Sequence, residues 1–467
     1  MGYVSVSISG PLSSFCSVRQ PPAPAQPFVA FEHAYQTLVY REAVALGAGY
    51  REAEVELTHL RCAGIDVHKK LLTVCLRVVS GGTVRKQVRE FGTTTRDLLE
   101  LSDWLSSESV EHVAMESTGA YWKPVYNILE GTFQILLANA RHMRNVPGRK
   151  TDVKDAEWIA ELHAHGLLSP SFVPSAEQRG IRELTRTRTS LVGERSRLSN
   201  RIQKILEDAN VKLGSVASDV LGVSGRDMLQ SIIQGEEDPK KIAELARRSL
   251  RKKIPQLELA LEGRVRPHHR VVLKELMANV ESLDRSIANL NAAIESAMEA
   301  ASDPFETAVQ LIDTAPGAAR VSARAVAAEI GTNMAQFPTQ GHIASWAGIC
   351  PGNRESAGKR KSGRTTAGNR WLKATLIIMA HAAIRDPSTY LHALYRRKAA
   401  SRGKKRAIVA VAHSLLVSIY HMLKNGVAYQ ELGAEYFDRQ DKARTVQRLQ
   451  TRLQNLGYTV QLTEVAA

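Results

Sequence analysis

Alternation of apolar and polar residues along the chain predicts a strand-rich region that begins near Cys62. Five strands are expected, over residues 64–67, 71–79, 84–91, 112–115 and 134–138. The threonines at 93–95 can cap a helix over residues 96–105. Strands that alternate with helices predict an α/β layer architecture, in which the first strands form an antiparallel meander.

The apolar period changes to that of a helix between about residues 177 and 301. Positions from Ile181 to Ile205 follow a three-four spacing, with arginines (Arg188 and Arg195) at two positions of the apolar stripe. A cleaner heptad repeat follows at Leu273, Leu276, Val280, Leu283, Ile287, Leu290 and Ile294. Periodicity does not separate an antiparallel hairpin within one chain from a dimerising coiled coil, so both interpretations stay open.

These shifts divide the chain into five predicted segments. They are a poorly ordered N-terminal extension (1–58), an α/β domain (59–176), an all-α coiled-coil region (177–302), a mainly α-helical C-terminal domain (303–426) and a tail (427–467) with a basic amphipathic helix. Residues 311–330 read as a helix, a Pro-Gly turn and a helix. This helix-hairpin-helix shape can place turn amides against a DNA phosphate, although such helix pairs are common for structural reasons alone.

Composition favours a nucleic-acid partner. The 467 residues include 62 Lys+Arg and 47 Asp+Glu, a net charge of +15 that suits a polyanion. No stretch approaches the roughly 18–20 consecutive apolar residues that span a bilayer, so no membrane partner is expected. The four cysteines include no CxxC pair, which argues against a disulfide framework or a zinc ribbon and favours the reducing cytoplasm.

Four carboxylates occupy positions that suit a metal site. Asp66 lies in a strand just before a turn and Glu116 at the end of a later strand, so both can project from adjacent strands of one sheet. Asp152 and Asp155 share one face if their segment opens a helix. Converging acids repel unless a divalent cation neutralises them, and hard oxygen ligands suit Mg²⁺, with Mn²⁺ as a substitute. The alternative is that all four are ordinary surface acids.

The C-terminal domain contains a loop rich in cations around Ser356. Residues 352–373 hold seven Lys/Arg and one Glu, and such cations can stabilise a serine alkoxide and an attacked phosphate. A loop serine is nevertheless more often a plain surface residue. A second run, residues 396–406, places seven cations within eleven positions. The predicted nucleic-acid contacts in these two stretches are Arg354, Lys359, Arg360, Lys361, Arg370, Arg396, Arg397, Lys404, Lys405 and Arg406.

Three motifs resemble those of a known family. The segments 64–69, 115–122 and 150–156 occur in the order found in DEDD transposases of the insertion sequence 110 family, and the resemblance spans almost everything after residue 60. It implies a RuvC-like, ribonuclease H-like fold for the α/β domain, with Mg²⁺ held by Asp66, Glu116, Asp152 and Asp155. Neighbouring residues that either contact DNA or support the ligands, or are simply solvated, are His68, Lys69, Asn139 and Lys150.

The resemblance also gives the serine a role. The family's C-terminal domain has a proline, a few residues, then Ser-Gly, followed by Gly-Asn and a helix, and this chain has Pro351, Ser356 and Gly368-Asn369. Here Ser356 precedes Ala-Gly, so Ser362, which precedes glycine directly, competes for the role. The distance from Pro351 favours Ser356.

The resulting prediction is a bacterial transposase in which Ser356 forms a phosphoserine with a cut DNA strand that is later rejoined. The resemblance implies element ends and target DNA as substrates, a bridge RNA that pairs with both, and a dimer or tetramer whose composite site joins the acids of one subunit to the serine of another. Such an enzyme works in the cytoplasm, at the nucleoid. The alternatives are a RuvC-like hydrolytic junction nuclease, in which Ser356 is a bystander, and a non-catalytic nucleic-acid scaffold.

Overall fold

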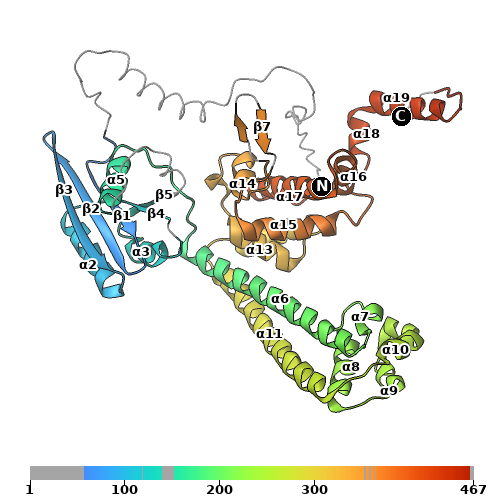
Figure 1. The fold of residues 1–467 in the computed structure, drawn as a ribbon. Helices are drawn as coiled ribbons and strands as arrows, with labels where there is room; N and C mark the ends of the chain where they lie inside the picture. Colours follow the sequence, from blue (N-terminus) through green and yellow to red (C-terminus); the bar gives the residue numbers. More distant parts are fainter. Residues whose placement is uncertain are drawn as a thin grey trace, which may run out of the picture. The chain divides into compact units, whose positions relative to one another are not determined.

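The computed structural model describes residues 57–117, 119–138, 152–351, 354–356, 359–362 and 364–462, and it divides into two compact units after Ser171 (Figure 1). The predicted N-terminal extension, except for its last two residues, and the candidates Asn139 and Lys150 lie outside the described residues. The division of the chain into five segments stays a prediction.

The first unit is built on a mixed five-stranded sheet with the strand order β3-β2-β1-β4-β5. β1, β2 and β3 are antiparallel neighbours, and β4 and β5 continue the sheet parallel to β1. The predicted strands and the antiparallel meander are therefore confirmed, and the N-terminal region is α/β. The strands are β1 (Arg61–Val67), β2 (Leu71–Ser80), β3 (Thr83–Gly92), β4 (His112–Glu116) and β5 (Gln134–Ala138).

Helices lie on both faces of this sheet. α5 (Asp152–Ala164) packs on β1, β2 and β4. On the other face, Phe91 of β3 lies 5.5 Å, centroid to centroid, from Trp104 of α2 (Thr95–Ser107), and α2 contacts α3 (Trp122–Leu129). α2 begins at the predicted threonines, because Thr94 and Asp97 form a reciprocal capping box. β1 is thus covered from both sides, which explains its nearly complete burial.

The second unit contains a long antiparallel helical arm. α6 (Ala176–Asp208) and α11 (Pro267–Ala300) lie side by side within one chain (Figure 1). The two arginines of the apolar stripe on α6 have hydrogen-bond partners on α11. Arg188 donates to Asn291, and Arg195 Nε lies 2.6 Å from Asp284 Oδ1. The structure therefore realises the intrachain hairpin, while coiled-coil dimerisation stays untested.

The far end of the arm has an apolar core of its own, in which Ile202, Leu229, Leu257 and Leu273 are fully buried. Short helices supply most of it, and they join α6 to α11. They are α7 (Leu213–Val216), α8 (Val223–Gln234), α9 (Pro239–Ala243), the 3₁₀ helix η2 (Arg248–Lys253) and α10 (Ile254–Leu261).

The C-terminal region is mainly helical, and its core is continuous with the base of the arm. Ile181 of α6 and Ile294 of α11 belong to the same buried cluster as Phe305 and Leu415. The helices are α12 (Phe305–Asp313), α13 (Arg320–Ile330), η3 (Met334–Gln336), α14 (Gln340–Trp346), α15 (Arg370–Ala383), α16 (Tyr390–Arg402) and α17 (Lys404–Asn425), with a hairpin of β6 (Arg354–Ser356) and β7 (Lys359–Ser362) between α14 and α15.

The predicted helix, Pro-Gly turn and helix are present as α12, a turn and α13. The turn packs closely on α15, because a Cβ on Gly317 would lie 2.2 Å from the backbone oxygen of Met379. Gly317 also has a φ of +75°, which only glycine adopts without strain. The turn therefore has a clear structural role.

Among the described helices, α17 is long and apolar enough to cross a membrane by length and composition. Half of its apolar window is buried inside the protein, and Val411, Leu415 and Ile419 are fully buried. It packs against α12, α14, α15 and α16, so it serves as a core helix of the C-terminal region.

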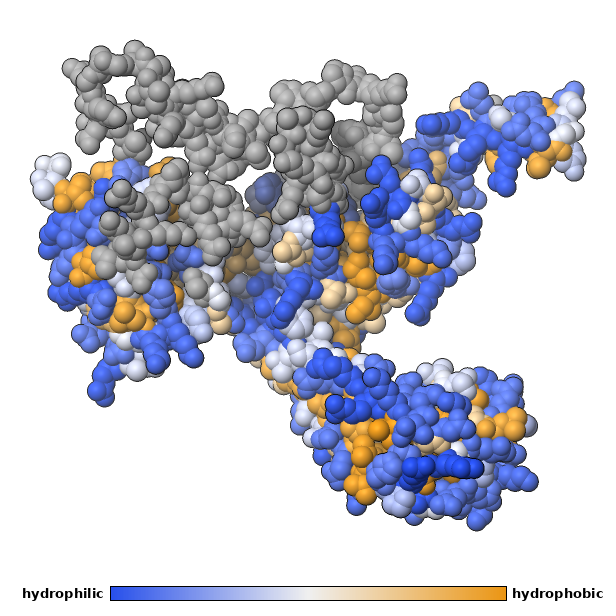
Figure 2. Space-filling model, in the orientation of Figure 1, coloured by the Kyte–Doolittle hydropathy of each residue, from blue (hydrophilic) through white to orange (hydrophobic). Residues whose placement is uncertain are grey.

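The tail contains α18 (Tyr436–Gln440) and α19 (Lys442–Asn455). α19 is the predicted basic amphipathic helix. Its four cations share the surface with exposed Val446, Leu449 and Leu453, and Figure 2 shows both hydrophilic and hydrophobic residues on this segment.

Candidate active site and nucleic-acid interface

Two of the predicted acids end neighbouring parallel strands. In the register of β1 and β4, Ile65 lies opposite Met115, so Asp66 and Glu116 occupy the next positions along the two strands. Side chains alternate between the faces of a sheet, which puts both acids on the face that carries Gly64. Asp66 is only 7% exposed and Glu116 is half-buried.

Helix α5 covers this same face at very short range. A Cβ on Gly64 would lie 2.3 Å from Ala160 N and 2.5 Å from Ala156 O, distances that no real side chain tolerates. The absence of a side chain at Gly64 is thus what lets the α5 backbone pack directly on β1.

The direction of α5 brings its first turn to the acidic strand ends. The amide of Thr58, just before β1, donates to Ala164 O at the end of α5 (2.8 Å), so the helix runs antiparallel to the strand. Its beginning therefore lies over the end of β1 that carries Asp66. The segment of Asp152 and Asp155 does open a helix, as predicted. Asp155 is half-buried, and the side chain of Asp152 lies outside the described residues.

Asp66 has a basic neighbour. His68 Nε2 lies 3.0 Å from Asp66 Oδ2, and the His68 side chain is half exposed. On the adjacent strand, Thr73 pairs with Asp66 and is also buried. A carboxylate buried this deeply is costly unless a cation or hydrogen-bond donors compensate it. His68 supplies part of that compensation, and its role beside a metal site or DNA stays a prediction.

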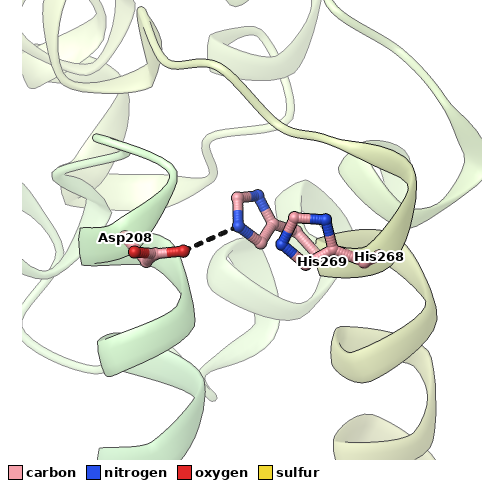
Figure 3. A group of neighbouring side chains, drawn as sticks. All are labelled: Asp208, His268 and His269. Atoms are coloured by element: carbon pink, nitrogen blue, oxygen red, sulfur yellow. Dashed lines mark hydrogen bonds and ion pairs between the residues drawn. The ribbon is translucent and has the colours of Figure 1, made fainter.

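Within the described part of the chain, one group of three potential metal ligands has its ligand atoms within 4.8 Å of one another, and it is a different group: Asp208, His268 and His269 (Figure 3). His269 Nδ1 accepts a hydrogen bond from the Arg266 amide (3.2 Å), so its Nε2 bears the proton and donates to Asp208 at 2.8 Å. A ring nitrogen that carries a proton does not bind a metal. This cluster caps α11 and ties it to the end of α6.

Ser356 lies in a small antiparallel hairpin. It pairs with Lys359 and is the last residue of β6, whereas Ser362 pairs with Arg354 at the other end of the two strands. The prediction of a plain loop over residues 352–369 is wrong for this part, because the backbones of residues 354–356 and 359–362 pair with each other. The side chains of Arg354, Ser356, Lys359, Arg360 and Lys361 lie outside the described residues.

The base of this hairpin is closed by backbone contacts. Pro351 forms a bridge with Thr365, whose hydroxyl accepts from Lys373 Nζ at 2.6 Å. Gly368 lies against Gly348 so closely that a Cβ would meet the Gly348 amide at 2.3 Å, and the φ of Gly368 is +49°. The close contact and the positive φ therefore both require glycine at the first position of the Gly-Asn motif.

Comparison with known proteins finds transposases. Residues 63–211 match the IS110-type DEDD transposase model, and residues 309–396 match the transposase model of the IS116/IS110/IS902 family. The chain is 26% identical over 359 residues to a probable family 20 transposase of Pseudomonas aeruginosa (75% of this chain, 88% of the relative). It is 22% identical over 397 residues to the transposase for insertion sequence element IS1111A of Coxiella burnetii (82% and 94%).

The chain belongs to the IS110 family of transposases. It is accordingly an enzyme that processes DNA, and the first matched region includes the strand ends with Asp66 and Glu116 as well as the start of α5. The second includes the hairpin of Ser356. A DEDD-type domain indicates that the transposase uses a divalent metal.

The transposase exposes a run of cations where α16 meets α17. All seven Lys/Arg between residues 396 and 406 are exposed, and no ion pair between described residues includes any of them. Arg397 lies over the Phe437 ring (4.9 Å), and Arg370, at the start of α15, lies over the Trp371 ring (4.8 Å). These side chains are open to solvent, and their contact with nucleic acid stays a prediction.

Sequence reasoning missed one buried acid of the transposase. Glu329, near the end of α13, is 2% exposed, and its two oxygens accept from Arg186 Nε and Nη2 of α6, each at 2.7 Å. Arg182 Nε donates to the Ala328 carbonyl (3.0 Å), and burial lowers the pKa of Arg182 to about 10. The signal was an acid inside the apolar run Ala-Val-Ala-Ala-Glu-Ile, which is costly without partners.

Proposed function

We propose that this transposase cuts and rejoins DNA through a covalent phosphoserine at Ser356, assisted by Mg²⁺ at Asp66, Glu116, Asp152 and Asp155. The observation that carries the proposal is the meeting of Asp66 and Glu116 at adjacent strand ends, under the first turn of α5. A mixed sheet with helices on both faces supports a RuvC-like, ribonuclease H-like fold for this unit.

The donor set suits a hard divalent cation. All four groups are carboxylates, and the burial of Asp66 in a sheet interior makes a compensating positive charge valuable. When bound, the metal supplies Lewis-acid stabilisation of negative charge on the scissile phosphate. The protein's part is to hold the ligands on rigid elements, and the close packing of α5 on Gly64 serves that purpose.

In both cleavage and rejoining, one oxygen–phosphorus bond forms while another breaks. Ser356 Oγ loses its proton and bonds to phosphorus, while the bond from phosphorus to the leaving sugar oxygen breaks and that oxygen gains a proton. The phosphodiester energy is retained in the serine ester, so a second sugar hydroxyl can reverse the exchange and rejoin the strand. Nearby cations, Arg354 and Lys359–Lys361 in the sequence, would stabilise the attacked phosphate.

The partners follow from the family and the charge. We infer that element ends and target DNA are the substrates, that Arg370 and the exposed cations of residues 396–406 bind backbone phosphates, and that a bridge RNA supplies sequence recognition. A dimer or tetramer would allow a composite site between subunits. The place of action is then the bacterial cytoplasm, at the nucleoid, without a membrane.

The test is a search for a covalent protein-DNA adduct. Purified protein, the flanking non-coding RNA and labelled element-end DNA are incubated with Mg²⁺ and then denatured. We expect an adduct in the wild type and in Ser362→Ala, and none in Ser356→Ala. Strand cleavage at equal rates in all three proteins, with no adduct, would contradict the proposal and identify a hydrolytic nuclease.

A further inference from the structure

A continuous polar chain runs from the helical arm to the base of the serine hairpin. Glu329 binds Arg186 of α6 with both carboxylate oxygens, and its Oε2 also accepts from Asn369 Nδ2 at 2.6 Å. Asn369 is the residue that starts α15 and ends the segment that contains the hairpin. The three side chains therefore connect two parts of the chain that are distant in sequence.

Asn369 is held from three directions. Its Oδ1 accepts from the amides of Trp371 and Leu372 (3.0 and 3.1 Å), which caps α15. Its own amide donates to Trp346 O at 3.0 Å, beside the contact of Gly368 with Gly348. Its Nδ2 is the one side-chain group left to face Glu329. This last contact joins the hairpin base to α6, next to Arg182 over the Trp346 ring (5.8 Å) and Arg186 over the Trp371 ring (6.0 Å).

We propose that Glu329 is a positioning residue of the strand-transfer reaction: through Asn369 it fixes the serine hairpin with respect to the helical arm. The proposal rests on the phosphoserine function stated above. Glu329 is buried and acts only through its neighbours. The helical arm and the hairpin of Ser356 then form one rigid part of the molecule. A partner that binds the arm therefore also fixes the position of Ser356.

A purely structural ion pair is the alternative, and single replacement of Glu329 does not distinguish the two. Removal of Glu329 alone leaves two cations, Arg186 and the buried Arg182 (Nε 3.6 Å from Glu329 Oε2), without their counter-charge and destabilises the fold. Removal of Glu329 together with Arg186 leaves only Arg182 without its counter-charge. The informative variants are therefore Glu329→Gln with Arg186→Gln, and Asn369→Ser. Serine caps a helix about as well as asparagine, so Asn369→Ser removes the contact to Glu329 and keeps the cap of α15.

The experiment measures the rate of adduct formation in a single turnover, at saturating DNA, together with the DNA concentration for half-saturation and the melting temperature. Asn333→Ser is the matched control, because Asn333 caps the 3₁₀ helix η3 through Ala335 and its cap lies outside the Glu329 network. We expect Asn369→Ser and the double variant to form the adduct about 10- to 10²-fold more slowly, with half-saturation close to the wild type. Melting should stay close to the wild type in Asn369→Ser and fall in the double variant, because Arg182 loses its counter-charge.

Three results would overturn the proposal, and they are distinguishable. Adduct formation at the wild-type rate in Asn369→Ser and in the double variant would make the network merely structural and leave the serine function intact. DNA cleavage by the wild type without any adduct would remove the serine function and the positioning role together. A loss of rate that exactly parallels a loss of melting temperature in both variants would also count against positioning.

Discussion

Asp66 and Glu116 stand at the ends of strands that are fixed by ladder hydrogen bonds and covered by helices, whereas Ser356 ends one of two short strands that form a two-stranded sheet. The acids are placed by the architecture of their unit. Ser356 is positioned by contacts at the base of its hairpin. These include the packing of Gly368 on Gly348 and the hydrogen bond from Asn369 to Glu329. Under the proposed function, the metal ligands are held by a rigid sheet, while the nucleophile is held by a short hairpin with a firm base.

Replacement of a strand-end acid should have the largest effect. Glu116→Gln keeps the shape of β4 and removes one charge from the proposed metal site, so we expect Mg²⁺-dependent cleavage to fall by about 10²–10³-fold with DNA binding retained. Glu111→Gln is the control, because Glu111 is exposed directly before the opposite end of β4. Single-turnover cleavage assays measure both. Equal activity of the two variants would remove Glu116 from the site.

Acid should weaken the unit that carries Asp66 and Glu116. Burial, together with His59 and His112, lowers the pKa of His163 from 6.5 to about 4. Below pH 6.5, His163 binds a proton in the unfolded chain but stays neutral in the folded chain. The free energy of unfolding is therefore highest above pH 6.5 and falls as the pH drops toward 4. The loss is at most about 3 kcal/mol. Hydrogen exchange of α5 and α15 peptides as a function of pH measures it.

The control for this pH dependence is a pair of variants. His163→Leu should flatten the pH dependence of the first unit, and His165→Leu, two residues further on, should leave it as in the wild type. An unchanged pH dependence in His163→Leu would show that other groups destabilise the unit in acid.

Loss of the exposed cations should have the smallest effect and act on DNA binding alone. For Lys404→Gln, Lys405→Gln and Arg406→Gln combined, we expect the slope of log affinity against log salt to become shallower by up to about 3, since each phosphate contact contributes about 0.9. Lys240, Lys252 and Lys274, exposed on the arm, provide a variant with the same charge change. Equal slopes for both triple variants would mean that total charge, and not this site, governs binding.

The sheet and its acids were predictable because their signals are local. Apolar alternation defines β1 to β5, and an acid at a strand end is visible in the residues around it, as at Asp66. The hairpin of Ser356 was not predicted, since its lysines and arginines read as loop and the pairing is between backbones. Glu329 was missed because Arg186, its partner, lies 143 residues away in the sequence. Contacts of that range are set by the packing of α6 on α13, which periodicity does not encode.

The central claim is that the cut DNA strand becomes covalently bound to Ser356, and peptide mapping of the adduct tests this claim most directly. Wild-type protein is reacted with element-end DNA, RNA and Mg²⁺, digested with nuclease and protease, and the nucleotide-bearing peptide is sequenced by mass spectrometry. The account predicts a phosphodiester-linked nucleotide on Ser356. A nucleotide on Ser362, or cleaved DNA with no modified peptide, would contradict it.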